Sequence, residues 1–337
     1  MTENFYATRL NSFRVGAEEY WPGKNGKVTT LDVLGRAAKV KNLTAVDLNY
    51  PDHLDGLTET EITNKLSSLG LHLNGFAMRY YGNPGYKLGA FTNPDDKVRR
   101  AAIDLTKRGL DSLAKMGGSL MTLWMGQDGF DYSFQADYGM VWNHTVEAIR
   151  EVCDHNPNID VSVEYKPNEP RSFSLMPDVA TTLLAIKEVE RQNLGVTLDF
   201  AHVLYADEMP AYAAMLIHRH SRLLGVHLND GYGKRDDGLM VGSVHPQQTI
   251  ELLYVLNKIK YQGAIYFDTF PDITGLDPIQ ECSTNISTVE AMKQIVAKLT
   301  KNEILAAAIL KQDAVTSQAI VQAAMFGHSI NYLQRVL

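Results

Sequence analysis

Short β-like runs alternate with longer helix-like segments along almost the whole chain, and this alternation limits the folds open to it. Eight apolar runs fit strands, at 6–13, 43–49, 71–78, 119–124, 160–165, 195–200, 223–228 and 264–268. A helix-like segment follows each of them. Eight successive strand–helix units are typical of a (β/α)8 barrel, so we predict an α/β fold of the TIM-barrel type.

The alternative for such an alternation is a doubly wound sheet, which commonly carries a Gly-rich phosphate loop after an early strand. No G-x-G-x-x-G or Walker sequence occurs in the chain. Helical patterns continue beyond the eighth unit, over 289–300 and 303–326. We therefore expect one barrel domain over residues 1–300 and a C-terminal helical extension over 301–337.

Composition and charge are those of an ordinary globular protein, with 337 residues of which 45% are hydrophobic and 21% charged. The net charge of −7 and the scattered basic residues argue against a nucleic-acid partner. Cys153 and Cys282 show no paired spacing, which favours neither disulfides nor a thiolate zinc site and suits the reducing cytoplasm. No apolar leader or membrane-length run occurs, so neither secretion nor membrane insertion is expected.

Polar side chains end the last four predicted strands. Glu164 and Lys166 share one face at the end of the fifth strand, while Asp199, His227 and Asp268 end the next three. The C-terminal strand ends of a barrel meet at one mouth. Three carboxylates and one imidazole make a mixed oxygen and nitrogen shell that suits Mn²⁺, Mg²⁺ or Co²⁺. The alternative for Glu164 and Lys166 alone is an ion pair at a strand terminus.

A second polar set lies beside the first. His202 follows Asp199 by three residues, and Asp236 and Asp237 lie in the polar loop after the seventh strand. His202, Asp236 and Asp237 are candidates for holding a second metal ion. The alternatives are a helix-start histidine that is bonded to backbone and an exposed turn that carries two aspartates.

Four motifs occur together in the second half of the chain. They are VEYKPNEP at 163–170, GVTLDFAH at 195–202, GVHLND at 225–230 with DDGLMVGS at 236–243, and YFD at 266–268. Together they resemble the xylose-isomerase-like barrels of sugar isomerases and sugar-phosphate epimerases. The resemblance covers residues 5–300 and is closest to the L-rhamnose isomerase type.

The resemblance implies a role for each polar position. The residues that would bind a structural ion are Glu164, Asp199, His227 and Asp268, and those that would bind a catalytic ion are His202, Asp236 and Asp237. Lys166 matches the lysine that polarises the carbonyl oxygen at carbon 1 of the sugar. Residues 123–130 resemble the tryptophan-bearing loop of xylose isomerases, which implies that Trp124 and Phe130 bind the sugar together with His202.

Two positions depart from the family pattern. Gly238 stands where the last aspartate of the second-ion set is expected, which leaves that shell incomplete. Asp268 replaces the glutamate that ketohexose epimerases pair with their strand-five glutamate. A two-glutamate proton exchange would therefore have one shorter arm in this chain.

We expect a divalent-metal-dependent aldose–ketose isomerase that acts on an unphosphorylated monosaccharide, with Glu164, Lys166 and Asp268 as catalytic residues and Mn²⁺ preferred over Mg²⁺ or Co²⁺. The first alternative is a metal-dependent sugar epimerase, or a C-glycoside-cleaving lyase subunit that acts on 3-oxo-glycosides by proton abstraction beside a small partner subunit. A barrel that binds sugars without turnover is the second alternative, which Lys166 disfavours. We also expect a homo-oligomer, a dimer or a tetramer.

Overall fold

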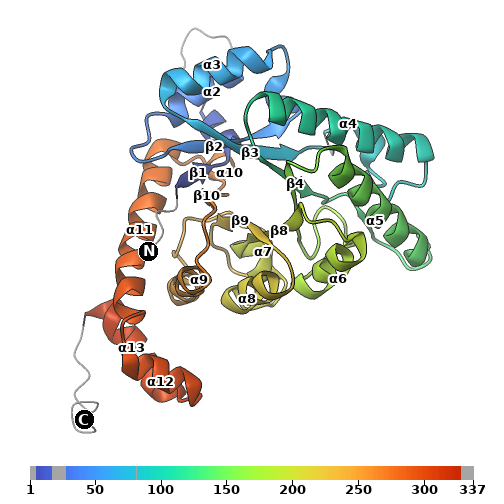
Figure 1. Cartoon of the computed structure of the whole chain (residues 1–337). Coiled ribbons are helices and arrows are strands. Elements are labelled where there is room, and N and C mark those ends of the chain that lie inside the picture. The colour runs from blue at the N-terminus through green and yellow to red at the C-terminus, as the bar shows by residue number, and fades with distance from the viewer. Residues whose placement is uncertain (1–4, 17–27, 81, 328–337) are drawn as a thin grey trace.

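The computed structural model describes residues 5–16, 28–80 and 82–327 of the chain. Its centre is a sheet of eight parallel strands, joined in the order β1-β10-β9-β8-β6-β4-β3-β2 (Figure 1). These strands are β1 Tyr6–Thr8, β2 Ala45–Tyr50, β3 His72–Met78, β4 Leu120–Trp124, β6 Asp160–Glu164, β8 Leu194–Asp199, β9 Leu223–Leu228 and β10 Ile265–Phe267.

The two ends of this strand order, β1 and β2, bring the sheet round on itself. An isolated parallel bridge joins Arg9 to Asp47, and the Thr44 amide donates to the Tyr6 carbonyl at 3.2 Å. The barrel is therefore nearly closed, and the predicted TIM-barrel fold is confirmed.

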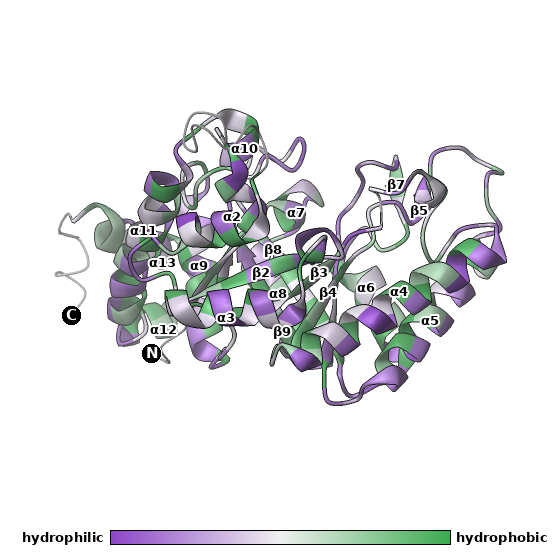
Figure 2. Cartoon of the chain, turned by 90° about the horizontal axis from the view of Figure 1, so that it is seen from above, coloured by the Kyte–Doolittle hydropathy of each residue, from purple (hydrophilic) through white to green (hydrophobic). Residues whose placement is uncertain are grey.

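Helices follow the strands and cover the outside of the sheet (Figure 1). The longer ones are α2 Thr30–Ala37, α3 Glu59–Leu69, α4 Asp96–Lys115, α5 Tyr138–His155, α6 Val179–Val189, α8 Pro210–His220, α9 Pro246–Lys258 and α11 Pro278–Leu299. Short helices follow β8 and β10, namely α7 Phe200–Tyr205 and α10 Pro271–Thr274, and the 3-10 turns are η1 Leu10–Arg14, η2 Asp52–Leu54 and η3 Pro84–Tyr86. A two-stranded antiparallel sheet, β5 Gly129–Phe130 with β7 Phe173–Ser174, stands away from the barrel strands in Figure 2.

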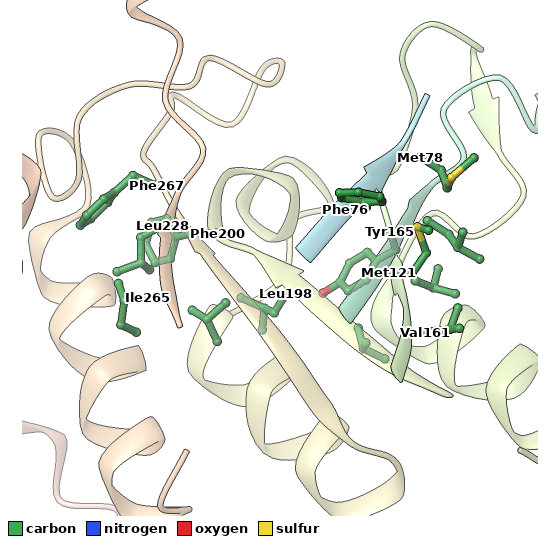
Figure 3. Packing of buried hydrophobic residues seen from close by; sticks show 14 of the residues in the cluster. Phe76, Met78, Met121, Val161, Tyr165, Leu198, Phe200, Leu228, Ile265 and Phe267 are labelled. Atoms are coloured by element: carbon green, nitrogen blue, oxygen red, sulfur yellow. The ribbon is translucent and has the colours of Figure 1, made fainter. Parts of the chain in front are cut away.

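The strands and the inner faces of the helices share one apolar core. Figure 3 shows side chains of this core, among them Phe76 on β3, Leu198 on β8 and Phe267 on β10, all fully buried. The helices carry both hydrophobic and hydrophilic residues along their length, as α4 and α5 show in Figure 2. Burial of the hydrophobic face of each helix against the sheet is the main stabilising contribution that holds the outer helices to the barrel strands.

A small polar layer lies inside the barrel beneath the strand ends. The Ser162 hydroxyl lies 2.7 Å from Thr197 Oγ1 and donates to Thr122 Oγ1 at 3.2 Å. All three side chains are buried and come from neighbouring strands. Because strand side chains alternate, Glu164 is the next residue of β6 to share the face of Ser162. The hydroxyls therefore satisfy one another directly beneath a site carboxylate.

The first strand is shorter than the pattern at 6–13 predicts. It ends at Thr8, and Leu10–Arg14 form the 3-10 helix η1. The Ser12 hydroxyl donates to the Thr269 carbonyl at 2.7 Å, and the Ser12 amide donates to the Arg9 carbonyl at 3.2 Å. These contacts turn the chain across the barrel mouth, which an apolar pattern alone does not reveal.

The C-terminal helices differ from the prediction in their boundaries. The helix predicted at 289–300 is the end of α11, which begins at Pro278 because Asp277 caps it. The stretch 303–326 forms two helices, α12 Glu303–Leu310 and α13 Ala314–Phe326, since Asp313 caps the second of them. Both extend beyond the barrel wall in Figure 1, and the division of the chain at residue 300 stays a prediction.

The protein is expected to lose stability as the pH is lowered, because of His53, which is buried beside β2. His53 Nδ1 accepts the Asn49 amide at 2.9 Å, and Nε2 lies 2.6 Å from Asn11 Oδ1, an arrangement that suits the neutral ring. Burial, aided by the charges of nearby arginines, lowers the pKa of His53 to about 3. The unfolded chain, in which this pKa is about 6.5, then binds more protons, so stability is lost as pH falls below that value.

Urea unfolding of the wild type and of His53→Gln at pH 7.0, 6.0 and 5.0 tests this dependence. Between pH 6 and 5 the wild type should lose up to about 1.4 kcal/mol per pH unit more than the variant, whatever their difference at pH 7. Equal slopes for the two proteins would show that His53 is not held neutral.

Candidate metal centre

The C-terminal ends of β6, β8, β9 and β10 bring four ionisable side chains together. Glu164, Asp199, His227 and Asp268 each offer one ligand atom, and these atoms all lie within 4.8 Å of one another. Strand pairing sets this arrangement, because Asp199 is in register with His227 across β8 and β9. The geometry is that of a small cation site at the barrel mouth.

His227 Nδ1 lies among the carboxylates. It is 3.3 Å from Glu164 Oε1, 3.9 Å from Asp199 Oδ2 and 4.0 Å from Asp268 Oδ2. The imidazole ring is also packed against the Tyr266 ring, with the two centroids 4.2 Å apart. The tyrosine therefore restricts the ring and keeps Nδ1 turned toward the carboxylates.

The pKa shifts of this cluster reflect crowded charge in a buried place. Burial and the neighbouring carboxylates raise the pKa of Asp199 to about 7, with His202 opposing them. Burial likewise raises the pKa of Asp268. Burial opposes charge on His227, yet Glu164, Asp268 and Asp199 raise its pKa to about 9. Binding of a cation would relieve the repulsion between the carboxylates and release this proton.

The donor set fits a hard divalent ion. Three carboxylates and one imidazole are oxygen and nitrogen ligands without thiolate, and Asp268 Oδ1 is buried with no hydrogen-bond partner in the described part of the chain. Arg9 Nε lies 3.7 Å from this oxygen, beyond hydrogen-bond distance. A carboxylate oxygen that is buried and unpaired is costly, and coordination would satisfy it.

Asn229 orients two of these ligands and was missed by the sequence analysis. Its Nδ2 donates to Asp199 Oδ2 at 3.0 Å, to Asp199 Oδ1 at 3.2 Å and to the Asp268 carbonyl at 3.1 Å. Its Oδ1 accepts the Ala201 amide at 2.8 Å. A signal was present, because Asn229 follows His227 by two residues and alternation places both side chains on one face.

Lys166 and His202 share a carboxylate oxygen. Asp236 Oδ2 lies 3.1 Å from Lys166 Nζ and 3.1 Å from His202 Nε2, and Glu169 Oε2 lies 3.0 Å from Lys166 Nζ. Burial opposes charge on Lys166, but Asp236 and Glu169 raise its pKa overall. The structure thus holds a charged ammonium next to the four-residue cluster.

Only two members of the second predicted metal set, His202 and Asp236, come together, while Asp237 is bonded within its own loop. Asp237 Oδ2 accepts the Tyr232 amide at 2.8 Å, and Asp237 Oδ1 accepts from Arg235 Nε at 2.8 Å. His202 directs Nδ1 to the Tyr165 carbonyl at 3.0 Å and Nε2 to Asp236. Within residues 5–16, 28–80 and 82–327, the only group of three or more such ligands is the four-residue cluster.

Trp124 forms a wall of the pocket beside this centre, and Phe130 lies further out. Lys166 Nζ lies 5.6 Å from the Trp124 ring centroid, and the Arg79 guanidinium lies 5.8 Å from it. Phe130 is on β5, where its ring stacks on Phe173 with centroids 5.5 Å apart. Trp124 is therefore placed to contact a ligand near Lys166, while Phe130 belongs to the small outer sheet.

Comparison with known proteins supports the fold and the family. The family model described as "Xylose isomerase-like TIM barrel" matches residues 36–288. Xylose isomerase of Thermus thermophilus is 28% identical over 209 residues, and that of Thermus caldophilus is 27% identical over the same length. Each match covers 60% of this chain, but the chain spans only 54% of the length of these relatives.

Several solved structures share the fold. An L-ribulose 3-epimerase has a TM-score of 0.67 at 13% identity, covering 89% of this chain and 99% of its own. D-allulose 3-epimerase from Methylomonas sp. has a TM-score of 0.67 at 15% identity, covering 86% of this chain and 97% of its own. A D-tagatose 3-epimerase-like protein has a TM-score of 0.66 at 14% identity, covering 88% and 99%. At this identity the matches show the fold alone, and none of these proteins is an L-rhamnose isomerase.

No helix in the described ranges is both long enough and apolar enough to cross a bilayer.

Addition of Mn²⁺, Mg²⁺ or Co²⁺ to metal-stripped protein is expected to raise its melting temperature. An ion that binds only the folded chain stabilises it by about 2.7 kcal/mol at a concentration of 100 times Kd. His227→Ala should abolish the shift, and elemental analysis should find bound metal only in the wild type. A wild type without bound metal and without a thermal shift would contradict the assignment.

Asn229→Ala is expected to weaken the affinity for the divalent ion by about 10- to 100-fold, the usual cost of losing a residue that orients a metal ligand. Competition titration with a fluorescent chelator measures it. Asn257→Ala, which removes a partly exposed asparagine of α9 that is bonded to Thr300, should retain wild-type affinity. If both variants bind the ion equally well, Asn229 has no role in holding the ligands.

Proposed function

The chain belongs to the xylose isomerase-like TIM barrel family, and we propose on this premise that it is a divalent-metal-dependent aldose–ketose isomerase acting on an unphosphorylated monosaccharide. The proposal places one ion among Glu164, Asp199, His227 and Asp268. Mn²⁺ is the preferred ion, because oxygen ligands with a single imidazole suit it well.

The observation that carries this proposal is the position of Lys166. Its ammonium is held by two carboxylates next to the cation site and against the face of Trp124. A protein that only bound sugars would have no need for a buried cation there. An isomerase needs a cation at this position, because negative charge develops on the carbonyl oxygen of the open-chain sugar.

The residues divide the chemistry between them. The bound ion would supply Lewis-acid polarisation of neighbouring sugar oxygens. Lys166 donates a hydrogen bond to the carbonyl oxygen, and Trp124 covers the apolar face of the sugar and excludes water. Asp236 fixes the ammonium in direction, because one of its oxygens lies 3.1 Å from Lys166 Nζ. Hydrogen then moves between carbons 1 and 2.

The chain offers fewer ligands for a second ion than for the first. His202 and Asp236 are in contact, but Asp237 is bonded to its own loop and Gly238 offers no ligand. We therefore propose that the four-residue cluster is the principal metal site. His202 and Asp236 then serve chiefly to position Lys166 and the sugar.

Epimerisation is a second candidate, favoured by the facing carboxylates of Glu164 and Asp268. Their ligand atoms lie within 4.8 Å of each other, so both carboxylates are close to any sugar carbon bound at this centre. Glu164 would abstract a proton, as it would in a lyase acting on 3-oxo-glycosides with a small partner subunit. The shorter Asp268 side chain disfavours this route. The L-rhamnose isomerase type, the homo-oligomeric state and the cytoplasmic location stay predictions.

Lys166→Ala is expected to lower turnover of the preferred sugar by about two to four orders of magnitude, because charge stabilisation at the carbonyl is lost. Metal content should stay at the wild-type level. Lys39→Ala, which removes an exposed lysine beyond α2, provides the matched control and should turn over normally. Near-normal turnover of the Lys166 variant would contradict the catalytic role and show that Lys166 only forms an ion pair at a strand end.

Turnover of a panel of aldoses and ketoses in D₂O separates a direct hydrogen shift from proton abstraction by Glu164. A direct shift of hydrogen between carbons leaves little deuterium at carbon 1 or 2 of the product, as read by NMR. Proton abstraction by Glu164 lets the proton exchange with solvent and gives stoichiometric incorporation. The second result would reject the shift in favour of Glu164 as a base. Action on 3-oxo-glycosides without turnover of any free sugar would support the lyase route instead.

A further inference from the structure

One pocket of the barrel mouth contains two polar groups that the proposed reaction does not use. It is a small cavity of about 20 Å³, and its lining includes Trp124, Glu164 and Lys166. Asp128 and Ser174 line the same pocket. They come from the loops after β4 and β6, next to the proposed catalytic centre but outside it.

Asp128 lines the pocket with one carboxylate oxygen that accepts hydrogen bonds and one that, among the described residues, accepts none. Its side chain is 2% exposed. Oδ1 accepts the Thr92 amide at 2.7 Å, the Thr92 hydroxyl at 2.9 Å and the Ala90 amide at 3.1 Å. Oδ2 is buried and has no hydrogen-bond partner among the residues that the structure describes. The loop after β3 therefore saturates one oxygen and fixes the direction of the other.

Ser174, at the end of β7, also has a buried polar atom without a hydrogen bond among the described residues. This atom is its hydroxyl oxygen, Oγ. Ser174 pairs with Gly129 between β5 and β7, and the Leu175 amide donates to the Asp128 carbonyl at 3.0 Å. Asp128 and Ser174 are thus held side by side by backbone contacts, one offering an acceptor and the other a hydroxyl that can donate.

We propose that Asp128 and Ser174 form a hydroxyl-binding subsite for the part of the substrate remote from the metal centre. A substrate hydroxyl donates to Asp128 Oδ2 and accepts from the Ser174 hydroxyl. This inference rests on the proposed function, because it needs a polyhydroxylated ligand that also reaches Lys166. Satisfying a buried unpaired carboxylate oxygen would make the hydroxyl a strong determinant of specificity.

The charge of Asp128 also limits what the remote end of the substrate can be. A phosphate or carboxylate there would face a carboxylate in a buried place, where like charges repel strongly. An apolar end would leave both polar atoms unsatisfied. The subsite therefore selects a free hydroxyl, which agrees with an unphosphorylated sugar.

Binding of xylitol to the Mn²⁺-loaded full chain, measured by isothermal titration calorimetry, tests the subsite. Asp128→Asn keeps an oxygen for the amides of Ala90 and Thr92 but replaces the pocket acceptor by a donor. We expect the affinity for xylitol to fall on the order of 10- to 100-fold. At least one monodeoxy pentitol, which lacks the recognised hydroxyl, should bind the wild type and this variant equally well. Ser174→Ala should give a smaller loss.

Asp131→Asn is the matched control. Asp131 accepts the Ser172 amide at 2.9 Å and so holds the same loops together without lining the pocket. It should bind xylitol as the wild type does, and melting curves of all variants report whether they fold. Equal xylitol affinity for the wild type, Asp128→Asn and Ser174→Ala would overturn the subsite and leave ordered water as the partner of both groups. Failure of the wild type to bind any polyol would overturn the proposed sugar site and the subsite with it.

Discussion

The structure depends on one electrostatic constraint, the gathering of Glu164, Asp199 and Asp268 around His227 where water is excluded. Charges in such a place are costly unless they are paired, and burial raises the pKa of Asp199 and Asp268 accordingly. The barrel withstands this cost because strand pairing and Asn229 fix the side chains. A bound cation would relieve the repulsion between these carboxylates, and this relief would contribute to the affinity for the ion.

The loop after β9 brings the next layer of charge to this centre. Asp230 is fully buried and closes the base of the loop, since its carboxylate accepts the amides of Gly231, Val244 and His245 and lies 2.9 Å from His245 Nδ1. The tip of the loop then presents Asp236 to Lys166. A flexible lysine thereby becomes a positioned cation, because each hydrogen bond removes rotamers that the free side chain would sample.

The loops after β3, β4 and β6 form the other wall, and Arg171 connects all three. Its guanidinium donates to the Lys87 carbonyl at 2.9 Å and to the Gly129 carbonyl at 3.1 Å. With Asp128 bonded to Ala90 and Thr92, this wall behaves as one unit built from segments far apart in the chain. In the proposed reaction the strand ends would supply the metal ligands and this wall would select the substrate, a division that is common in barrels where loops vary on a fixed frame.

The sequence by itself determined the eight strand–helix units and the polar ends of the strands, because the period of two and the loss of apolar character are local signals. It also separated Glu164, Asp199, His227 and Asp268 from other polar residues. Only the tertiary structure decided between the adjacent Asp236 and Asp237, one of which meets Lys166 from 70 positions away while the other bonds its own loop. The directions of loop side chains depend on such distant partners, so neither this division nor the contacts of Asp128 could be predicted from local pattern.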